Sequence, residues 1–338
     1  MRGNGVLKHH YHPRAGWMND PNGLCFFAGR YHAYYQHEPH HEYPWDGPMC
    51  WGHAVTRDFV TWEKRRPAIL PGEPYDAKGV WSGTAIEKDG VLYAYYASVG
   101  EDGRQTVSVA VSRDGDVFEK YSGNPILTGY PKGRTNDFRD PAVYIEGGRA
   151  YLVVASGDTT NGTGCLLLYT GEDMLHWEFA GVMLEFEHST ACECPSFVKV
   201  GDEYILSTSV MPIGGEPYFI AMCGSFDGRR FTPRVTSRFQ KGPDQYAGQI
   251  FHAPDGRNIL ITWIPGWKYQ SREKCVGCLS LPCEITVDGD IIRAYPVSEV
   301  RHLLDGNDTL TDAYVRERFV RGGEEVHTEL IGIPKTED

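Results

Sequence analysis

The sequence lacks a long hydrophobic run, an apolar leader and an excess of positive charge. No stretch approaches the ~18 apolar residues that a membrane span needs. Residues 1–12 are polar and rich in histidine, without the apolar centre of a secretion signal. The formal net charge is -12, and such a surface repels both a phosphate backbone and an anionic membrane. We therefore expect no nucleic-acid or membrane partner, and a small neutral molecule as the ligand.

Cysteine pairing and metal motifs are scarce as well. The 9 cysteines are an odd number in a chain without a secretion signal, so reduced thiols and a cytoplasmic location fit better than a disulfide framework. Cys275 and Cys278 form a CxxC with Cys283 nearby. No second CxxC or HxxxH lies within reach to complete the four ligands of structural zinc, so we expect no metal and no cofactor.

Two groups of histidines are the other candidate metal ligands. Their spacing matches no common metal motif, and we interpret them as loop residues. The histidines are His9, His10 and His12, followed by His37, His40 and His41.

Helical periodicity is also rare, and few stretches keep a 3.6-residue apolar period for three turns, which disfavours an α/β fold. With 338 residues and 41% hydrophobic content, the chain can nonetheless bury a large core. Its clearest pattern is a repeated β-hairpin, in which two apolar or aromatic runs flank a tight Gly/Asp turn. The five hairpin segments are LCFFAGRYHAYYQ, TAIEKDGVLYAYYAS, AVYIEGGRAYLVVAS, SFVKVGDEYILSTS and IFHAPDGRNILITW.

The hairpins recur at a nearly constant interval. Their turns begin at residues 29, 89, 147, 201 and 255, in steps of 60, 58, 54 and 54. The first four are each followed by a strand, an aspartate and an aromatic four residues later, as in HAVTRDFVTW. Two hairpins in about 55 residues make one propeller blade. We therefore predict an all-β, five-bladed β-propeller within residues 1–300, and a short tail at 301–338 with one or two extra strands.

Three acidic residues fall at equivalent places in different repeats. Asp20, Asp140 and Glu193 precede their hairpin turns by nine, seven and eight residues, which places them on the innermost strands of blades one, three and four. They should converge at one mouth of the central channel. A cation site is the competing interpretation, but the adjacent Arg139 and nearby tryptophans favour a sugar-binding pocket.

Sugar hydrolysis needs two carboxyl groups in different states, one ionised and one carrying a proton for the leaving oxygen. Crowding of like charges pushes one carboxyl toward its neutral form. With Arg139 and backbone donors close by, we expect Asp20 and Asp140 to stay charged. Glu193 is then the proton donor.

These motifs resemble the signature blocks of glycoside hydrolase family 32, the invertases and fructosidases. The blocks are WMNDPNG at 17–23, FRDP at 138–141 and ECP at 193–195, and further blocks agree in order over about residues 8–300. The resemblance implies a retaining mechanism, in which Asp20 forms a fructosyl-enzyme, Glu193 is the general acid and base, and Asp140 holds sugar hydroxyls and stabilises the transition state. The pocket positions that it implies are Asn19, Gln36, Trp45, Trp81, Ser82, Arg139, Tyr246 and Trp263.

Two departures from the family pattern affect the expected pocket and assembly. Trp81 replaces the usual phenylalanine, and YYQHEP with WDGPMCWG differs from the common YQYNP and WG spacing, so the leaving-group side should differ. The resemblance implies a C-terminal β-sandwich after the propeller, and we expect residues 301–338 to be too short to form it. Apolar propeller surface that the β-sandwich would otherwise cover would then be exposed, and we expect a homo-oligomer to cover it.

The sequence leaves several functions open. Sucrose, sucrose-6-phosphate and short inulin-type, levan-type or difructose saccharides are all candidate substrates. Fructosyl transfer shares the same covalent intermediate as hydrolysis. An inverting arabinanase-type propeller and a non-catalytic sugar-binding propeller are the remaining alternatives.

Overall fold

The structure is a computed structural model that describes residues 7–41, 47–131, 135–158, 161–242, 244–265 and 277–332. Within these ranges the regular structure is β-strand, apart from one 3-10 turn at Arg301–Leu303. The all-β prediction is therefore confirmed. The same ranges contain no helix with the length and apolar character needed to cross a bilayer.

The strands form consecutive antiparallel sheets. The first sheet contains β1 (Trp17–Phe27), β2 (Arg30–Glu38), β3 (Cys50–Thr56) and β4 (Glu63–Lys64). The second contains β5 (Gly79–Lys88), β6 (Val91–Val99), β7 (Gln105–Ser112) and β8 (Glu119–Lys120). The third contains β9 (Phe138–Glu146), β10 (Arg149–Asp158), β11 (Thr163–Gly171) and β12 (Glu178–Glu187).

The remaining sheets follow in the same direction along the chain. The fourth contains β13 (Ser189–Val200), β14 (Glu203–Pro212), β15 (Tyr218–Phe226) and β16 (Phe231–Ser237). The fifth contains β17 (Tyr246–His252), β18 (Asn258–Ile264), β19 (Cys278–Leu279), β20 (Cys283–Asp288) and β21 (Ile291–Pro296). The last contains β22 (Thr309–Asp312), β23 (Val315–Val320) and β24 (Glu325–Leu330).

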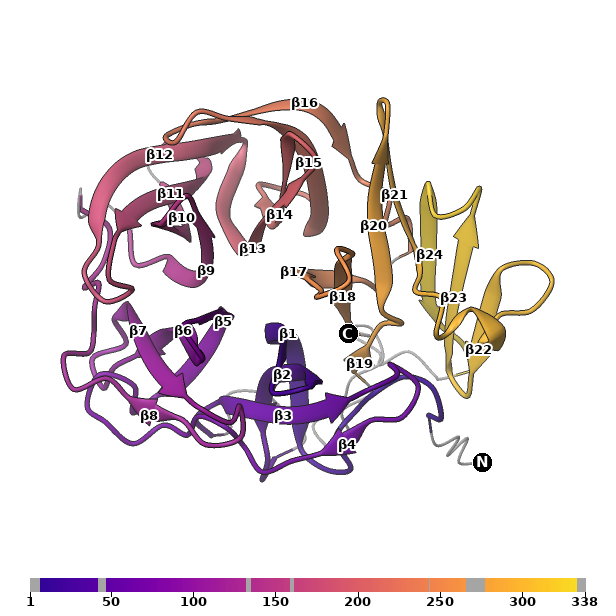
Figure 1. Cartoon of the computed structure of the whole chain (residues 1–338), viewed down its shortest axis with the longest axis horizontal. Helices are drawn as coiled ribbons and strands as arrows, with labels where there is room; N and C mark the ends of the chain where they lie inside the picture. The colour runs from indigo at the N-terminus through magenta and orange to yellow at the C-terminus, as the bar shows by residue number, and fades with distance from the viewer. Residues whose placement is uncertain are drawn as a thin grey trace.

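The first strand of each of the first five sheets faces a common centre (Figure 1). Strand β1 packs on β5, β5 on β9, β9 on β13 and β13 on β17, and β17 closes the ring against β1. Apolar side chains fill the space between neighbouring sheets. Phe197 and Leu206, for example, pack with Val153 and Leu166 of the third sheet. The acids predicted on innermost strands are thus on β1, β9 and β13.

The predicted hairpin turns lie between the first two strands of each sheet. Two consecutive residues with positive φ, the requirement of a type I′ turn, occur at Asp89–Gly90 and at Gly147–Gly148. In the first hairpin this pair is Ala28–Gly29, with φ of 47° and 77°. The turn therefore begins one residue earlier than Gly29, where the sequence placed it.

The repeated aspartate forms the turn between the third and fourth strands of the first four sheets. Its Oδ1 accepts hydrogen bonds from the backbone N–H groups two and three residues ahead, at 2.7–3.0 Å. This local turn explains the recurring sequence marker. The four aspartates are Asp58, Asp114, Asp173 and Asp227.

The segment after residue 300 adds a three-stranded sheet, where the sequence predicted one or two strands. Its apolar residues Leu310, Phe319 and Val326 bury against Ile285 and Ile292 of the fifth sheet. Its alternating pattern was harder to detect, because charged residues separate the buried ones along β23 and β24.

Two of the histidines that we interpreted as loop residues are buried and hold other parts of the fold by hydrogen bonds. His37 is buried on β2 and donates to Trp17 O at 2.7 Å. His10 is buried between Asp312 and Glu317 of the last sheet, at 3.0 and 2.8 Å. Cys275 lies outside the described residues, and Cys278 and Cys283 are buried.

Candidate active site

The site is built on an irregularity shared by the five inner strands. Each has a β-bulge, in which two of its residues lie opposite one residue of the second strand. A bulge re-aims side chains that a regular strand would direct into the sheet packing. The bulged pairs are Asn19–Asp20, Trp81–Ser82, Asp140–Pro141, Cys194–Pro195 and Ala247–Gly248.

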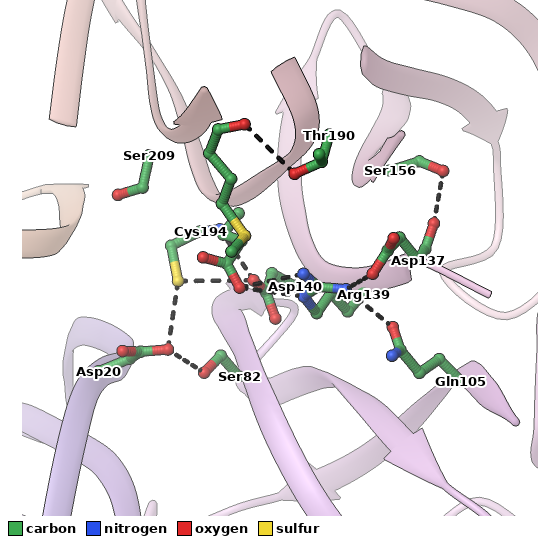
Figure 2. Close-up of polar contacts among 12 residues, drawn as sticks. Asp20, Ser82, Gln105, Asp137, Arg139, Asp140, Ser156, Thr190, Cys194 and Ser209 are labelled. Atoms are coloured by element: carbon green, nitrogen blue, oxygen red, sulfur yellow. Dashed lines mark hydrogen bonds and ion pairs between the residues drawn. The ribbon is translucent and has the colours of Figure 1, made fainter. Parts of the chain in front are cut away.

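The bulges bring the three predicted acids into one network. Asp140 accepts a hydrogen bond from Cys194 N at 2.9 Å. The Cys194 thiol lies 3.4 Å from Asp20 Oδ2 and 3.5 Å from Asp140 Oδ2, so it joins the two carboxylates (Figure 2). Ser82 donates to the same Asp20 oxygen at 2.7 Å. Glu193 directly precedes Cys194 on β13.

Two donors orient the Glu193 carboxylate. Arg139 donates to Oε1 through Nε and Nη2, at 3.2 and 3.1 Å. Tyr246 donates its hydroxyl proton to Oε2 at 2.5 Å. The opposite side of the Arg139 guanidinium is fixed by Asp137 Oδ1 at 2.5 Å and Gln105 Oε1 at 3.2 Å.

The pKa values of Asp20 and Asp140 are both raised, which the sequence did not predict. Burial raises the pKa of Asp20, the Ser82 hydrogen bond partly offsets this, and the Glu193 charge adds to the rise. Burial also raises the pKa of Asp140 to about 7, although Arg139 opposes it. Burial therefore opposes the expected negative charge on both acids, and for Asp140 the rise reaches the neutral range. The physical reason is that Arg139 hydrogen-bonds Glu193 and leaves Asp140 buried beside two other carboxyls.

The other predicted pocket residues lie around these acids. Gln36 is buried and donates to Val80 O at 3.1 Å, and Asn19 accepts from Trp17 Nε1 at 2.8 Å. Trp81 is partly buried on β5. Trp263 is 1% exposed and packs edge-on against Trp17, so it supports the pocket from behind. Trp45 lies outside the described residues.

Three residues that contribute to the site were not predicted from the sequence. Cys194 entered the sequence prediction only as part of the ECP motif, although its position directly after Glu193 made it a candidate site residue. Asp137 and Gln105 fix Arg139, and only proximity to FRDP pointed to Asp137. Gln105 had no sequence signal, because β7 brings it to the site from another repeat. Within the described ranges no cluster of three His, Cys, Asp or Glu side chains is arranged to bind a metal.

Comparisons with known proteins point to one family. The chain matches the glycosyl hydrolases family 32 N-terminal domain over residues 10–296. It is 35% identical to a sucrose-6-phosphate hydrolase of Escherichia coli, over 94% of this chain and 70% of that protein. It is 36% identical to a raffinose invertase of Escherichia coli, over 87% of this chain and 65% of that protein. The chain thus spans about two thirds of the length of these two relatives.

Solved structures share the fold. A GH32 beta-fructofuranosidase of Bombyx mori superposes with a TM-score of 0.86 at 23% identity, covering 99% of this chain and 90% of that chain. A sucrose-6-phosphate hydrolase from Lactobacillus gasseri superposes with a TM-score of 0.87 at 21% identity, covering 97% and 88%.

Proposed function

The chain belongs to glycosyl hydrolase family 32, and we propose that it cleaves terminal β-D-fructofuranosyl linkages with retention of configuration. The observation that carries this proposal is the network of Asp20, Asp140 and Glu193 on three inner strands. The Cys194 thiol lies between the two aspartates, and Arg139 donates to Glu193. We further propose that each of the first five sheets is one blade of a five-bladed propeller, formed by residues 1–300.

Asp20 is the nucleophile of the proposed reaction. Its carboxylate attacks the anomeric carbon of the fructosyl unit as the bond to the leaving oxygen breaks. Ser82 fixes the carboxylate by donating to Oδ2, which leaves Oδ1 for the attack. The product of this step is a fructosyl ester on Asp20.

Glu193 is the general acid and then the base. It protonates the leaving oxygen in the first step and removes a proton from water in the second. Asp140 in its ionised form accepts sugar hydroxyls, and substrate binding therefore favours that form.

Sucrose and sucrose-6-phosphate are the substrates that we propose. The named activities of the related sucrose-6-phosphate hydrolase and raffinose invertase support a small fructoside. The net charge of -12 makes long-range attraction of a phosphorylated substrate weak, so a phosphate needs a local cation at the pocket entrance.

The test is a panel of sucrose, sucrose-6-phosphate, kestose and raffinose with product identification by early-time NMR. We expect β-fructofuranose as the first product. Asp20→Asn and Glu193→Gln should each lower kcat by about 10³-fold or more, and Glu193→Gln should lose least on substrates with good leaving groups. Glu87→Gln, an exposed residue toward the other end of β5, is the matched control and should keep wild-type turnover.

Other results would contradict the proposal. Wild-type turnover by Asp20→Asn would remove its nucleophile. Inverted fructose or an arabinose product would indicate an inverting glycosidase. Sucrose binding without turnover would indicate a sugar-binding protein, and oligosaccharide products longer than the substrate would indicate fructosyl transfer.

A further inference from the structure

The Gln249 side chain joins three inner strands. It lies on β17, directly after the Ala247–Gly248 bulge, and is 3% exposed. Its Oε1 accepts a hydrogen bond from Leu24 N of β1 at 2.8 Å. Its Nε2 donates to Gly83 O of β5 at 3.0 Å and to Pro21 O of β1 at 3.4 Å. One amide group therefore links strands that come from three different sheets.

The two carbonyl groups that Gln249 binds are next to the nucleophile and its donor. Pro21 directly follows Asp20, and Gly83 directly follows Ser82. The Asp20–Ser82 hydrogen bond at 2.7 Å connects strands from different sheets. Its geometry therefore depends on the separation and register of β1 and β5 at this level, which Gln249 fixes from β17.

Gln249 does not face the acids themselves. It lines a cavity of about 490 Å³ together with Leu24, Ile86 and Val198, and none of the three acids is in that lining. Thr84 and Ser196, also in that lining, use their hydroxyls to bind backbone groups of β9 and β17. The polar groups at this level thus connect inner strands, which fits a role in positioning.

We propose that Gln249 is a positioning residue that sets the Asp20–Ser82 pair for nucleophilic attack. This rests on the proposed function, because it assigns Asp20 the attacking role. The amide is buried and fully engaged, so its contribution is the relative placement of two strands. Small displacements of a reacting group reduce the rate of the chemical step strongly, while ground-state binding through other pocket residues persists.

The first test is Gln249→Met, which keeps the length of the side chain and removes all three hydrogen bonds. We expect kcat to fall about 10- to 100-fold with KM within about twofold. A weakened Ser82 donation also raises the pKa of Asp20. Because the proposed reaction needs both Asp20 and Asp140 ionised, the acid limb of kcat/KM should therefore also move to higher pH.

The second variant, Gln249→Glu, keeps the acceptor for Leu24 N. It can donate to Gly83 O only when it is protonated, since an ionised carboxylate would face two carbonyl oxygens. The rate of Gln249→Glu relative to Gln249→Met should therefore rise as the pH falls. This variant carries the test if Gln249→Met does not fold.

Asn258→Leu is the matched control. Asn258 is a buried amide on β18 that donates to Lys199 O of β13 at 3.0 Å, so it also links two sheets. Asn258 pairs with His252, at the end of β17 opposite to Tyr246. Its loss should lower the melting temperature and leave kcat and the acid limb unchanged.

The Gln249 variants are interpreted only after turnover of sucrose or sucrose-6-phosphate by the wild type has been measured. An inactive wild type overturns the proposed function. An active wild type with Gln249 variants that lose only melting temperature, and keep both kcat and the acid limb, overturns the positioning role alone. A fall in kcat with constant KM, absent in Asn258→Leu, supports it.

Discussion

The protonation of Asp140 depends on the direction of a single arginine side chain. Arg139 is the residue before Asp140 in the sequence, yet its guanidinium hydrogen-bonds Glu193, Gln105 and Asp137. The Asp140 carboxyl therefore loses its hydration without gaining a direct ion pair. Burial is the largest cause of its raised pKa, and the Arg139 charge lowers that pKa only partly.

The pH dependence of kcat/KM should reveal this arrangement. If ionised Asp140 accepts sugar hydroxyls, activity falls as the pH drops through the pKa of Asp140, which is raised to about 7. The acid limb should therefore lie well above the value near 4 of an ordinary carboxyl group. Removing the positive charge in Arg139→Gln raises that pKa and moves the limb to higher pH.

Arg139→Lys is the control for charge, and it should move the limb less than Arg139→Gln while still reducing kcat, since lysine cannot reproduce the bidentate geometry. Steady-state kinetics between pH 4 and pH 9 is the measurement. An acid limb near pH 4 in the wild type would show that Asp140 is ionised more easily than its burial indicates.

Residue identities were easier to predict from the sequence than residue states. Asp20, Asp140 and Glu193 could be named as candidates because each lies seven to nine residues before a hairpin turn and in a recognisable motif. Their protonation states could not be predicted, because the pKa values depend on burial and on which carboxylate the Arg139 guanidinium contacts. Gln249 was likewise invisible as a positioning group, since its partners come from two other repeats.

At the scale of elements, the bulges of the inner strands determine which side chains enter the site. Three of them place a residue other than glycine at positive φ, with values of 55° at Asp140, 46° at Cys194 and 50° at Ala247. This left-handed conformation is costly for residues with a Cβ and worse for β-branched ones. The cost is tolerated where the bulge directs the neighbouring Glu193 and Tyr246 toward each other.

Substitution of Ala247 tests the need for this conformation. Valine is β-branched and disfavours φ near 50°, so Ala247→Val should destabilise the fold by about 2 kcal/mol. It should also lower kcat, because Tyr246 directly precedes the bulge. Ala247→Gly, which adopts this φ freely, should remain within about 1 kcal/mol of the wild type. Urea unfolding and kcat measure the two effects.

The contrary result is simple to recognise in this pair. If Ala247→Val unfolds at the wild-type urea concentration and keeps its kcat, the left-handed bulge is not required for the site.

The hairpin turns and the repeated aspartate marker could be found in the sequence because both are local patterns of Gly and Asp. The bulges could not, because a bulge is a register difference between two strands and has no fixed sequence.

At the scale of the whole molecule, the N-terminal segment ties the last sheet to the ring. Asp312 on β22 accepts from the backbone N–H groups of residues 8–10. His10 lies buried between Asp312 and Glu317, and Glu317 also accepts from Leu281 N next to the fifth sheet. His10 and Asp312 are 302 positions apart, so the sequence repeat, which predicted the ring, could not predict this closure.

His10 makes the stability of this closure depend on pH. Burial alone would lower its pKa, but Asp312 and Glu317 outweigh burial and raise it from 6.5 to about 9. A raised pKa in the folded state stabilises the fold fully below pH 6.5, and this stabilisation is lost as the pH rises through about 9. The difference corresponds to about 3 kcal/mol.

Urea unfolding of the wild type and of His10→Gln between pH 6 and pH 10 tests this dependence. The wild type should lose unfolding free energy over the range, and His10→Gln should be less stable at pH 6 with a flatter profile, because glutamine carries no charge between the two carboxylates. His302→Gln, an exposed histidine near the same sheet, should follow the wild type. Parallel profiles for the wild type and His10→Gln would mean that His10 is neutral in the fold, and that the closure relies on the backbone hydrogen bonds to Asp312 alone.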